Sequence, residues 1–525
     1  MHTTNKYLVW GLVTLSIQGC SLQKLDPVNW GTAGAGGESG GGQSNGGSTS
    51  ATTGGTSNPG SSAATGGVSS GGSSAQDTAG GNGGSRTEAP GEPCTAAQTT
   101  RSCSLAGALG TCATGMQTCE AGRWGACSVK PATKDTCVPG NDDNCNGTPN
   151  DTACKVLQIS AGFRHTCALL SDGLVRCWGA NAYGELGNDN TSDTPVPTLV
   201  KGIADVISVV AGSENTCAIL ADGTVSCWGK NSSRQLGERT VAASSSVPVV
   251  IQSALPASAV AVGETHICTI TKTDASVQCW GSSEFGALGN GSTTADTIAK
   301  PWSVPGLKGA TTIAAGARHT CASMSDGHVF CWGDNSLGQL GSISGGSKPT
   351  GTPQYVTLSD GTPAVLILQV TSMQDHVCAA LGFAQAQCWG QNGSGQLGSA
   401  TVSPGSRGWT ATLVGQDVSG TPLQKVAAMV TGREHTCASI SDGTAFCWGL
   451  NDNGQLGTGN VSNSNNPREV SLLTIQALSA GARHTCAILK DGTAWCWGQN
   501  TYRQLGDGSN VDLRALPVKV EKLLP

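Results

Sequence analysis

A fifteen-residue stretch that begins with His-Thr-Cys-Ala and ends with Cys-Trp-Gly recurs along this chain, and it constrains the fold more than any other feature. The first copy runs from His165 to Gly179. A fixed repeat of about fifty residues indicates a stacked array or a propeller, in which each unit buries its apolar surface against its neighbours. The Cys-Trp-Gly triplets are spaced by 49 to 59 residues and start at Cys177, Cys227, Cys279, Cys331, Cys388, Cys447 and Cys496.

Each repeat predicts a short β-hairpin closed by a disulfide. In the first copy two apolar runs flank Ser171-Asp172-Gly173, and a three-residue loop with Gly in the left-handed position is a common hairpin turn. This turn makes Cys167 face Cys177, and facing antiparallel residues lie within disulfide range. The third unit has one extra residue and no Asp-Gly, so its turn should differ. The other predicted pairs are Cys217–Cys227, Cys268–Cys279, Cys321–Cys331, Cys378–Cys388, Cys437–Cys447 and Cys486–Cys496.

The repeats predict an all-β fold, a seven-bladed β-propeller over residues 156–525. Their strands are apolar on both faces, as expected for strands covered on both sides. A Pro-containing extended segment follows each hairpin, which makes about four strands per unit and no helix. Seven units lie within the roughly four to eight blades of known propellers. We expect the last such segment, Leu516–Lys522, to pair beside the first blade and close the ring, because this removes an exposed sheet edge.

The recurring elements Gly-x-x-His-Thr-Cys-Ala, Asp-Gly, Trp-Gly-x-Asn and Gly-Gln-Leu-Gly resemble the regulator of chromosome condensation repeat family. The resemblance extends from Val156 to about Val520 and implies a seven-bladed propeller. The paired cysteines differ from the cytosolic members and resemble the secreted bacterial variety. The family includes a nucleotide-exchange factor for a small GTPase and a secreted propeller that inhibits β-lactamase. The resemblance therefore implies the fold and leaves the function open.

The N-terminus predicts a secretory signal and a lipid anchor. A basic residue precedes the apolar run Tyr7–Ile17, which is too short to span a bilayer. Gln18-Gly19-Cys20 resembles a bacterial lipobox, although its glutamine differs from the usual small residue. We expect a signal peptide over 1–19, lipidation at Cys20, and membrane contact through this anchor only. The alternative is an ordinary signal peptide followed by an incidental cysteine.

The cysteine count agrees with a secreted lipoprotein. The chain has 23 cysteines, and an odd cysteine in a secreted protein needs an explanation. The repeats contain 14 and the segment from Cys94 to Cys154 contains eight, which leaves Cys20 for a lipid. Paired cysteines also indicate an oxidising compartment. We expect the protein in the bacterial cell envelope, as an outer-membrane lipoprotein or at the cell surface.

Two segments separate the anchor from the repeats. Residues 20–92 are mostly Gly, Ser, Thr and Ala, and they cannot bury enough apolar surface to offset their ordering entropy, so we predict a disordered tether. Residues 93–155 form a cysteine-rich module with a predicted disulfide-stapled hairpin around Trp124. A segment this small needs such staples. Zinc is the rival interpretation, but no Cys-x2-Cys spacing occurs.

The end of this module carries an Asx-rich motif, a candidate calcium site. Hard cations prefer several oxygen ligands and a glycine turn. The motif resembles a metal-binding Asp/Asn-Cys-Asn-Gly motif of bacterial cell-surface proteins, and this implies Ca²⁺ as the one candidate cofactor. Ala153 stands where a calcium loop has Glu, so the alternative is an acidic turn held by disulfides. The candidate ligands are Asp142, Asn144, Asn146 and Asp151.

A histidine recurs at one register of the repeat. We interpret it as a structural hydrogen bond made once per blade rather than a metal ring, because Asn215 replaces it in the second unit and is a poor transition-metal ligand. No His-Glu-x-x-His occurs, and Gly-x-Ser-x-Gly occurs only within the Gly- and Ser-rich segment 20–92, so we expect no enzyme. A net charge of −6 argues against binding nucleic acid through a basic patch. The recurring histidines are His165, His266, His319, His376, His435 and His484.

The loops after each Trp-Gly contain one freely varying position, which collects large apolar residues in four units. Aromatic side chains on loops of a rigid scaffold are common anchors of recognition. We therefore predict a monomeric, non-enzymatic scaffold that binds an envelope or extracellular protein. The alternatives are an exchange-factor-like or enzymatic propeller, a purely structural envelope protein, and, for these side chains, packing onto their own blades. The predicted partner-binding residues are Tyr183, Phe285, Leu337 and Tyr502, together with Trp409 from a long connection.

Overall fold

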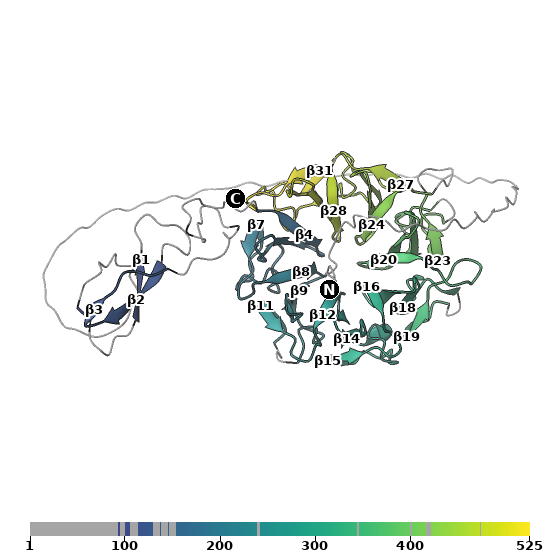
Figure 1. The fold of residues 1–525 in the computed structure, drawn as a ribbon. Helices are drawn as coiled ribbons and strands as arrows, with labels where there is room; N and C mark the ends of the chain where they lie inside the picture. The colour runs from purple at the N-terminus through teal and green to yellow at the C-terminus, as the bar shows by residue number, and fades with distance from the viewer. Residues whose placement is uncertain are drawn as a thin grey trace, which may run out of the picture. The chain divides into compact units, whose positions relative to one another are not determined.

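The computed structural model is all-β apart from short 3-10 turns such as η2 (Glu284–Gly286), within the residues that it describes. Seven four-stranded sheets and one three-stranded sheet make up the fold (Figure 1). The predicted signal peptide and tether lie outside the described residues, and so do Cys20, Asp142, Asn144, Asn146 and Asp151. The described ranges are 93–94, 100–104, 114–129, 137, 145, 154–238, 242–343, 346–399, 402–415, 422–472 and 474–524.

The seven four-stranded sheets each consist of four consecutive antiparallel strands. The first strands are β4 (Val156–Ala161), β8 (Val206–Ala211), β12 (Ala257–Val262), β16 (Ala310–Ala315), β20 (Ile367–Ser372), β24 (Val426–Thr431) and β28 (Ile475–Ala480). The second strands are β5 (His165–Leu170), β9 (Asn215–Leu220), β13 (His266–Thr271), β17 (His319–Met324), β21 (His376–Leu381), β25 (His435–Ile440) and β29 (His484–Leu489). The third strands are β6 (Val175–Gly179), β10 (Val225–Lys230), β14 (Val277–Ser282), β18 (Val329–Gly333), β22 (Ala386–Gln391), β26 (Ala445–Gly449) and β30 (Ala494–Gln499). The fourth strands are β7 (Thr194–Leu199), β11 (Ser244–Val250), β15 (Thr297–Ser303), β19 (Thr350–Tyr355), β23 (Arg407–Leu413), β27 (Ser464–Glu469) and β31 (Leu513–Lys519).

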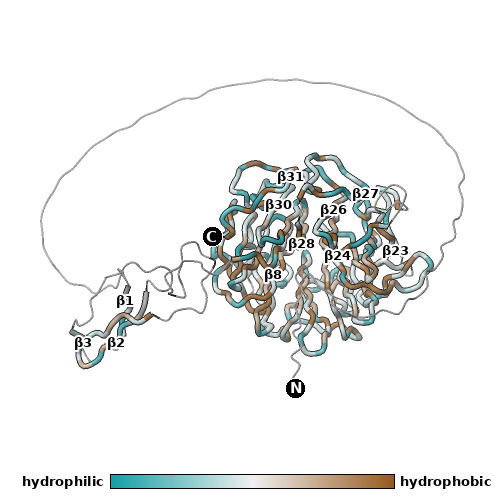
Figure 2. The backbone as a smooth tube through the Cα atoms, turned by 45° about the horizontal axis from the view of Figure 1, so that its top comes forward, coloured by the Kyte–Doolittle hydropathy of each residue, from teal (hydrophilic) through white to brown (hydrophobic). Residues whose placement is uncertain are grey.

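These sheets are the blades of a closed ring, numbered one to seven here in chain order. Each first strand contacts the first strand of the next blade, and β28 of blade seven contacts β4 of blade one. Figure 1 shows the first strands directed at the centre and the fourth strands on the rim. Hydrophobic stretches run along the blade strands in Figure 2, and most second strands are buried throughout. The predicted propeller architecture is therefore confirmed, with seven four-stranded blades.

The predicted mode of ring closure is wrong. The C-terminal strand β31 pairs with β30 of its own blade, in a register that places Lys519 opposite Trp495, and not beside blade one. Each repeat begins with an inner strand and supplies all four strands of one blade, so no strand is left to exchange. The ring instead closes by side-to-side packing of blades seven and one, in a core that contains Ile159, Trp178 and Ile488.

All seven hairpin disulfides are present in the structure. Cys167 and Cys177 lie opposite each other, with a Cα–Cα distance of 4.1 Å, and the other six pairs have distances of 4.0 to 4.1 Å. The turn of blade one is as expected: Gly173 has φ 81°, and the Leu174 amide donates to Asp172 Oδ1 at 2.9 Å. The third turn differs, since the Thr271 hydroxyl donates to Asp274 Oδ1 at 2.9 Å there.

The third strand of every blade bends at its tryptophan. The pairing of β6 with β7 shifts register between Cys177 and Gly179, and the six other blades shift at the equivalent residues. Gly179 has φ 105°, and a Cβ there would lie 2.6 Å from the Arg164 carbonyl oxygen and 2.8 Å from His165 Cα. Only glycine fits this position, so the Trp-Gly pair is a requirement of blade geometry.

The cysteine-rich module contains a separate three-stranded sheet of β1 (Thr100–Ser104), β2 (Thr114–Glu120) and β3 (Arg123–Trp124). A two-residue turn with positive φ at both positions joins β2 to β3, and Trp124 is buried. This is the hairpin expected around Trp124. The disulfides that sequence could not assign include Cys94–Cys119, Cys103–Cys127 and Cys137–Cys154.

We predict that replacing both Cys437 and Cys447 by Ala lowers the free energy of unfolding by up to about 3 kcal/mol, because the bond closes a short loop in the unfolded chain. Guanidinium chloride unfolding of the oxidised protein measures this difference, with reduced wild type as the control. Non-reduced peptide maps should contain all seven hairpin pairs. A disulfide between two different blades would contradict the assignment.

Candidate functional site

The turns before the second strands and the loops after the third strands lie together on one side of the ring, which we call the loop face. In blade one the Ala180 amide donates to the Arg164 carbonyl, and in blade seven the Gln499 amide donates to the Arg483 carbonyl, at 2.9 and 2.8 Å. Each pair joins a residue of the turn that precedes the histidine to a residue of the post-tryptophan loop. The two sets of segments therefore form one surface.

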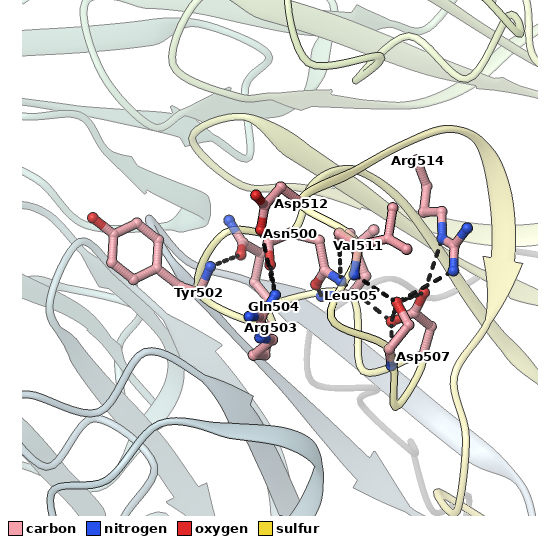
Figure 3. A network of polar contacts seen from close by, with 10 residues as sticks. Asn500, Tyr502, Arg503, Gln504, Leu505, Asp507, Val511, Asp512 and Arg514 are labelled. Atoms are coloured by element: carbon pink, nitrogen blue, oxygen red, sulfur yellow. Dashed lines mark hydrogen bonds and ion pairs between the residues drawn. The ribbon is translucent and has the colours of Figure 1, made fainter. Parts of the chain in front are cut away.

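Polar side chains of the post-tryptophan loops hold their backbones, and in most blades these are an asparagine and a glutamine. In blade seven the Leu505 amide donates to Asn500 Oδ1 at 3.1 Å, and the Tyr502 amide donates to Gln504 Oε1 at 2.9 Å (Figure 3). Asn500 Nδ2 also donates to the Val511 carbonyl at 2.8 Å, and Arg514 Nε donates to Asp507 Oδ2 at 3.0 Å. Figure 3 shows the Tyr502 ring pointing away from this network. The loop thus fixes the backbone and leaves the ring free for other contacts.

Beneath this face the tryptophan of every blade donates to a carbonyl of the preceding blade, and at five of the seven boundaries a threonine and a histidine extend this bond into a relay. In blade two, both Trp228 Nε1 and the Thr216 hydroxyl donate to the Glu185 carbonyl of blade one, at 2.7 and 2.9 Å. His165 Nε2 lies 2.8 Å from the same Thr216 hydroxyl. Because that hydroxyl already donates to the carbonyl, the histidine must donate, which assigns the proton to Nε2. The other complete relays centre on Thr320, Thr436, Thr485 and Thr166.

The relay confirms the structural role expected for the histidines. All six are buried, and burial lowers the pKa of His165 to about 4 and that of His435 to about 3. The imidazoles are therefore neutral near pH 7. Their Nδ1 atoms find no hydrogen-bond partner in blades three to seven of the described structure. Each histidine ring makes its hydrogen bond at its own blade boundary, which is a structural role and not that of a ligand to one shared metal ion.

The expected role of Asn215 is wrong, because its side chain does not replace the histidine. Both side-chain polar atoms of Asn215 are buried without a hydrogen-bond partner among the described residues. At the partner register of blade three, Ile267 stands in place of threonine, so no hydroxyl is available. Blade five also lacks the threonine, having Val377, and there Ser372 Oγ lies 3.0 Å from His319 Nε2 instead.

The predicted partner-binding residues are spread around the loop face, and three of them contact a cation of the next blade. The Tyr502 ring lies 4.8 Å from Arg164 Cζ, the Phe285 ring 5.0 Å from Arg318 Cζ, and the Tyr183 ring 5.2 Å from Lys230 Nζ. Tyr183 is 38% exposed. These rings neither pack fully onto their own blades nor stand free, so each bridges two blades and keeps an exposed edge.

Leu337 and Trp409 lie close together, although 72 positions separate them in the sequence. Trp409 is on β23 of blade five, and a Cβ on Gly338 of blade four would lie 3.3 Å from its ring. Both residues are partly buried, and Arg407 Cζ lies 5.8 Å from the Trp409 ring. The structure therefore joins these two predicted residues at one blade boundary.

The centre of the ring holds a cavity of about 220 Å³, lined by all seven first strands. The residues that line it are uncharged, and none of them has an ionisable side chain. Polar side chains are used to join blades: Gln158 exchanges two hydrogen bonds with the backbone of Val209, at 2.9 and 3.0 Å. Serine and threonine hydroxyls line this cavity, but no ionisable side chain lines it that could act as an acid or as the base that activates a hydroxyl.

The part of the chain that the structure describes contains no cluster of three or more His, Cys, Asp or Glu side chains placed to hold a metal ion. The candidate calcium ligands lie outside that part. The same described residues include no helix long and apolar enough to cross a membrane.

The closed ring of four-stranded blades defines a protein of the β-propeller class. The chain belongs to the RCC1-like domain family, whose model matches residues 94–418 and 259–525. The ultraviolet-B receptor UVR8 of Arabidopsis thaliana is 30% identical over 323 residues, which cover 60% of this chain and 70% of the receptor. The probable E3 ubiquitin-protein ligase HERC4 of Mus musculus is 35% identical over 322 residues, but this match covers only 29% of the ligase.

Solved structures show the same fold at lower identity. Prp20p from Saccharomyces cerevisiae superposes with a TM-score of 0.58 at 20% identity, over 70% of this chain and 88% of Prp20p. Human WBSCR16 superposes with a TM-score of 0.59 at 21% identity, over 67% of this chain and 95% of that protein. These identities support a common fold and do not transfer an activity.

The sequence-based search missed the basic residues of the turns before the second strands. Arg164, Arg433 and Arg483 occupy the variable positions of the Gly-x-x-His element, whose fixed residues are what mark the repeat. Their signal is weak because the sequence separates Arg164 from Arg483 by more than three hundred residues. Closure of the ring places blade seven beside blade one and brings them together.

We predict that acid weakens this fold through its buried histidines. Their folded pKa values lie near 3 to 4, below the ordinary value of 6.5, so the unfolded chain binds more protons between these limits. The free energy of unfolding therefore keeps its full value above about pH 6.5. Below that pH it falls by up to about 1.4 kcal/mol per pH unit for each histidine.

The variant His435→Asn isolates one histidine. At pH 7 its free energy of unfolding should be about 1–3 kcal/mol lower, since the Thr485 hydroxyl loses the imidazole N–H from which it accepts. Between pH 6 and 4.5 its stability should decline less steeply than that of wild type. Urea unfolding across this range measures both quantities. An unchanged slope would show that His435 is already protonated in the folded state.

Proposed function

We propose that this chain is a non-enzymatic protein-binding scaffold of the bacterial cell envelope, and that its partner docks on the loop face. The observation that carries the proposal is the set of partly exposed aromatic rings, each held between a rigid loop and a cation of the next blade. Tyr, Trp and Arg are the residues most often dominant in protein interfaces. The loops that present them are clamped by their own side chains, which lowers the entropy cost of binding.

The relatives support protein binding as a class of function. Prp20p was studied for its binding to Gsp1p and histones, and another structure shows yeast RCC1 (Prp20) bound to Kap60. We extend to this chain only the use of an RCC1-like propeller as a protein-binding surface. The small, uncharged central cavity also favours binding over catalysis.

The cellular setting of the proposal rests on the sequence. A signal peptide over 1–19, a lipid on Cys20 and the tether over 20–92 would present the propeller to an envelope or extracellular protein. The seven hairpin disulfides suit an oxidising compartment. In this proposal the propeller acts as a monomer, binds no nucleic acid, and needs no cofactor apart from Ca²⁺ at Asp142, Asn144, Asn146 and Asp151.

An exchange-factor-like propeller is the second candidate, favoured by the fold of Prp20p alone. It requires a cytosolic GTPase, which conflicts with a secretory signal and paired cysteines. A purely structural envelope protein is the third. Affinity capture from envelope extract with the full mature chain separates the candidates: a stoichiometric protein partner supports the scaffold, and an empty capture supports the structural protein.

We predict that Tyr183→Ala, Phe285→Ala and Tyr502→Ala each weaken partner capture by about 1–3 kcal/mol, because each removes a partly exposed ring from the loop face. Melting temperatures should stay close to wild type. Trp302→Ala is the matched control, since Trp302 is 45% exposed on the outer strand β15. If the control weakens capture equally, the partner does not select the loop face.

A further inference from the structure

One sector of the loop face contains a small basic pocket. It lies where blades six, seven and one meet, and its volume is about 210 Å³. Arg433, Arg483 and Arg164 reach it from the turns before β25, β29 and β5. The pocket is lined by these three arginines and by Phe163, Ala482, Gln499 and Tyr502.

Two aromatic rings position the guanidinium groups. Arg164 Cζ lies 4.8 Å from the centre of the Tyr502 ring and 5.6 Å from that of Phe163. Arg433 Cζ lies 5.8 Å from the Phe163 ring, so this ring is shared by two arginines. Such cation–π contacts hold planar guanidinium groups while leaving their N–H groups available.

The positive charge of this pocket is only partly neutralised. Arg483 Nη1 donates to Asp452 Oδ2 at 2.8 Å, and Arg433 Nε lies 3.6 Å from Glu434 Oε1. Arg164 is exposed, contacts the two rings, and forms no ion pair within the described residues. None of the lining residues is acidic. The pocket therefore carries a net positive charge, although the chain as a whole has a net charge of −6.

The same ring–arginine pair elsewhere on the loop face has different surroundings. Arg318 lies 5.0 Å from the Phe285 ring, but its charge acts on the nearby Asp375, whose pKa is raised chiefly by burial. Blades two and three carry Glu214 and Glu264 in the equivalent turns. In the sector of blades six, seven and one, by contrast, three arginines outnumber the two carboxylates that pair with them, so a net positive charge remains there.

We infer that this pocket binds a carboxylate of an acidic peptide segment on the partner protein. The inference rests on the proposed function and names the chemistry of the partner. Guanidinium groups pair with carboxylates through two parallel N–H···O bonds. The volume is below the roughly 300 Å³ at which cofactor-sized sites begin, so the pocket accepts one side chain or a chain terminus. The rings contact the apolar stem of that side chain.

The test uses the full mature chain and a fluorescein-labelled peptide of repeated Gly-Leu-Glu-Glu units, followed by fluorescence anisotropy. Wild type should bind this peptide and ignore its Gln-for-Glu counterpart. Arg164→Gln should weaken binding about tenfold or more, as expected for the loss of a charge-assisted hydrogen bond. Among the described residues Arg164 has no carboxylate partner that the substitution would leave unpaired, and a melting curve checks that the variant folds.

Lys300→Gln removes one exposed positive charge from the outer strand β15; it is the charge-matched control and should change binding less than about twofold. Equal losses in the two variants, binding of the Gln peptide, or no binding by wild type would each overturn the inference. Inorganic phosphate serves as a competitor, and tighter binding of phosphate than of the peptide would overturn it in favour of a phosphate site. If wild type captures a partner and Arg164→Gln captures it equally well, the inference about the pocket is refuted and the proposed function is not. If wild type binds the peptide but captures no partner, the proposed function is refuted and the pocket is not.

Discussion

The hydrogen bond that each buried tryptophan donates to the preceding blade, joined at five of the seven boundaries by a buried Thr and His, is the interaction on which the rest of the structure depends. One loop carbonyl, such as that of Glu185, accepts from both Trp228 and Thr216 of the following blade. His165 then donates to Thr216 and satisfies the hydroxyl. These groups are buried, so a donor or acceptor without its partner would lower the stability of the fold. The hydrogen bonds therefore fix how two neighbouring blades are placed, which apolar packing alone would not do.

The same relay connects the core to the loop face. The carbonyl that accepts from Trp and Thr belongs to the post-tryptophan loop, and the histidine follows the turn that carries the variable basic or acidic residue. Both halves of the loop face are thereby anchored at the five blade boundaries where the relay is complete. This allows residues such as Tyr502 and Arg164 to vary in chemistry without disturbing the blade, because their backbones are held by other groups.

The departures from the repeat show which parts of the relay are interdependent. Where Asn215 replaces histidine, Ile267 replaces the threonine with which it would pair, so the polar relay is absent from both sides of that boundary. The Trp280 indole still donates to the Gln235 carbonyl at 2.9 Å there. Loss of one relay is tolerated because the indole bond and the apolar packing remain.

Much of the architecture was predictable from sequence, because each copy of the repeat has the same turn, strand and cysteine residues and therefore forms the same local structure. The Asp-Gly turn places Cys167 opposite Cys177, and the seven copies make seven blades, as the structure shows. The histidines could be assigned a structural role from their register alone. Asn215 could not be interpreted from its own chemistry, since its meaning depends on the residue that faces it in the next blade.

Only the tertiary structure decided how the ring closes and which side chains meet across its boundaries. Local pattern describes one blade, but closure depends on which strand comes first in the repeat, and here β31 completes its own blade. The pocket between Arg164, Arg433 and Arg483 exists because closure places the last blade beside the first. Residues separated by hundreds of positions share no local signal, so their proximity is a property of the closed ring and not of any one repeat.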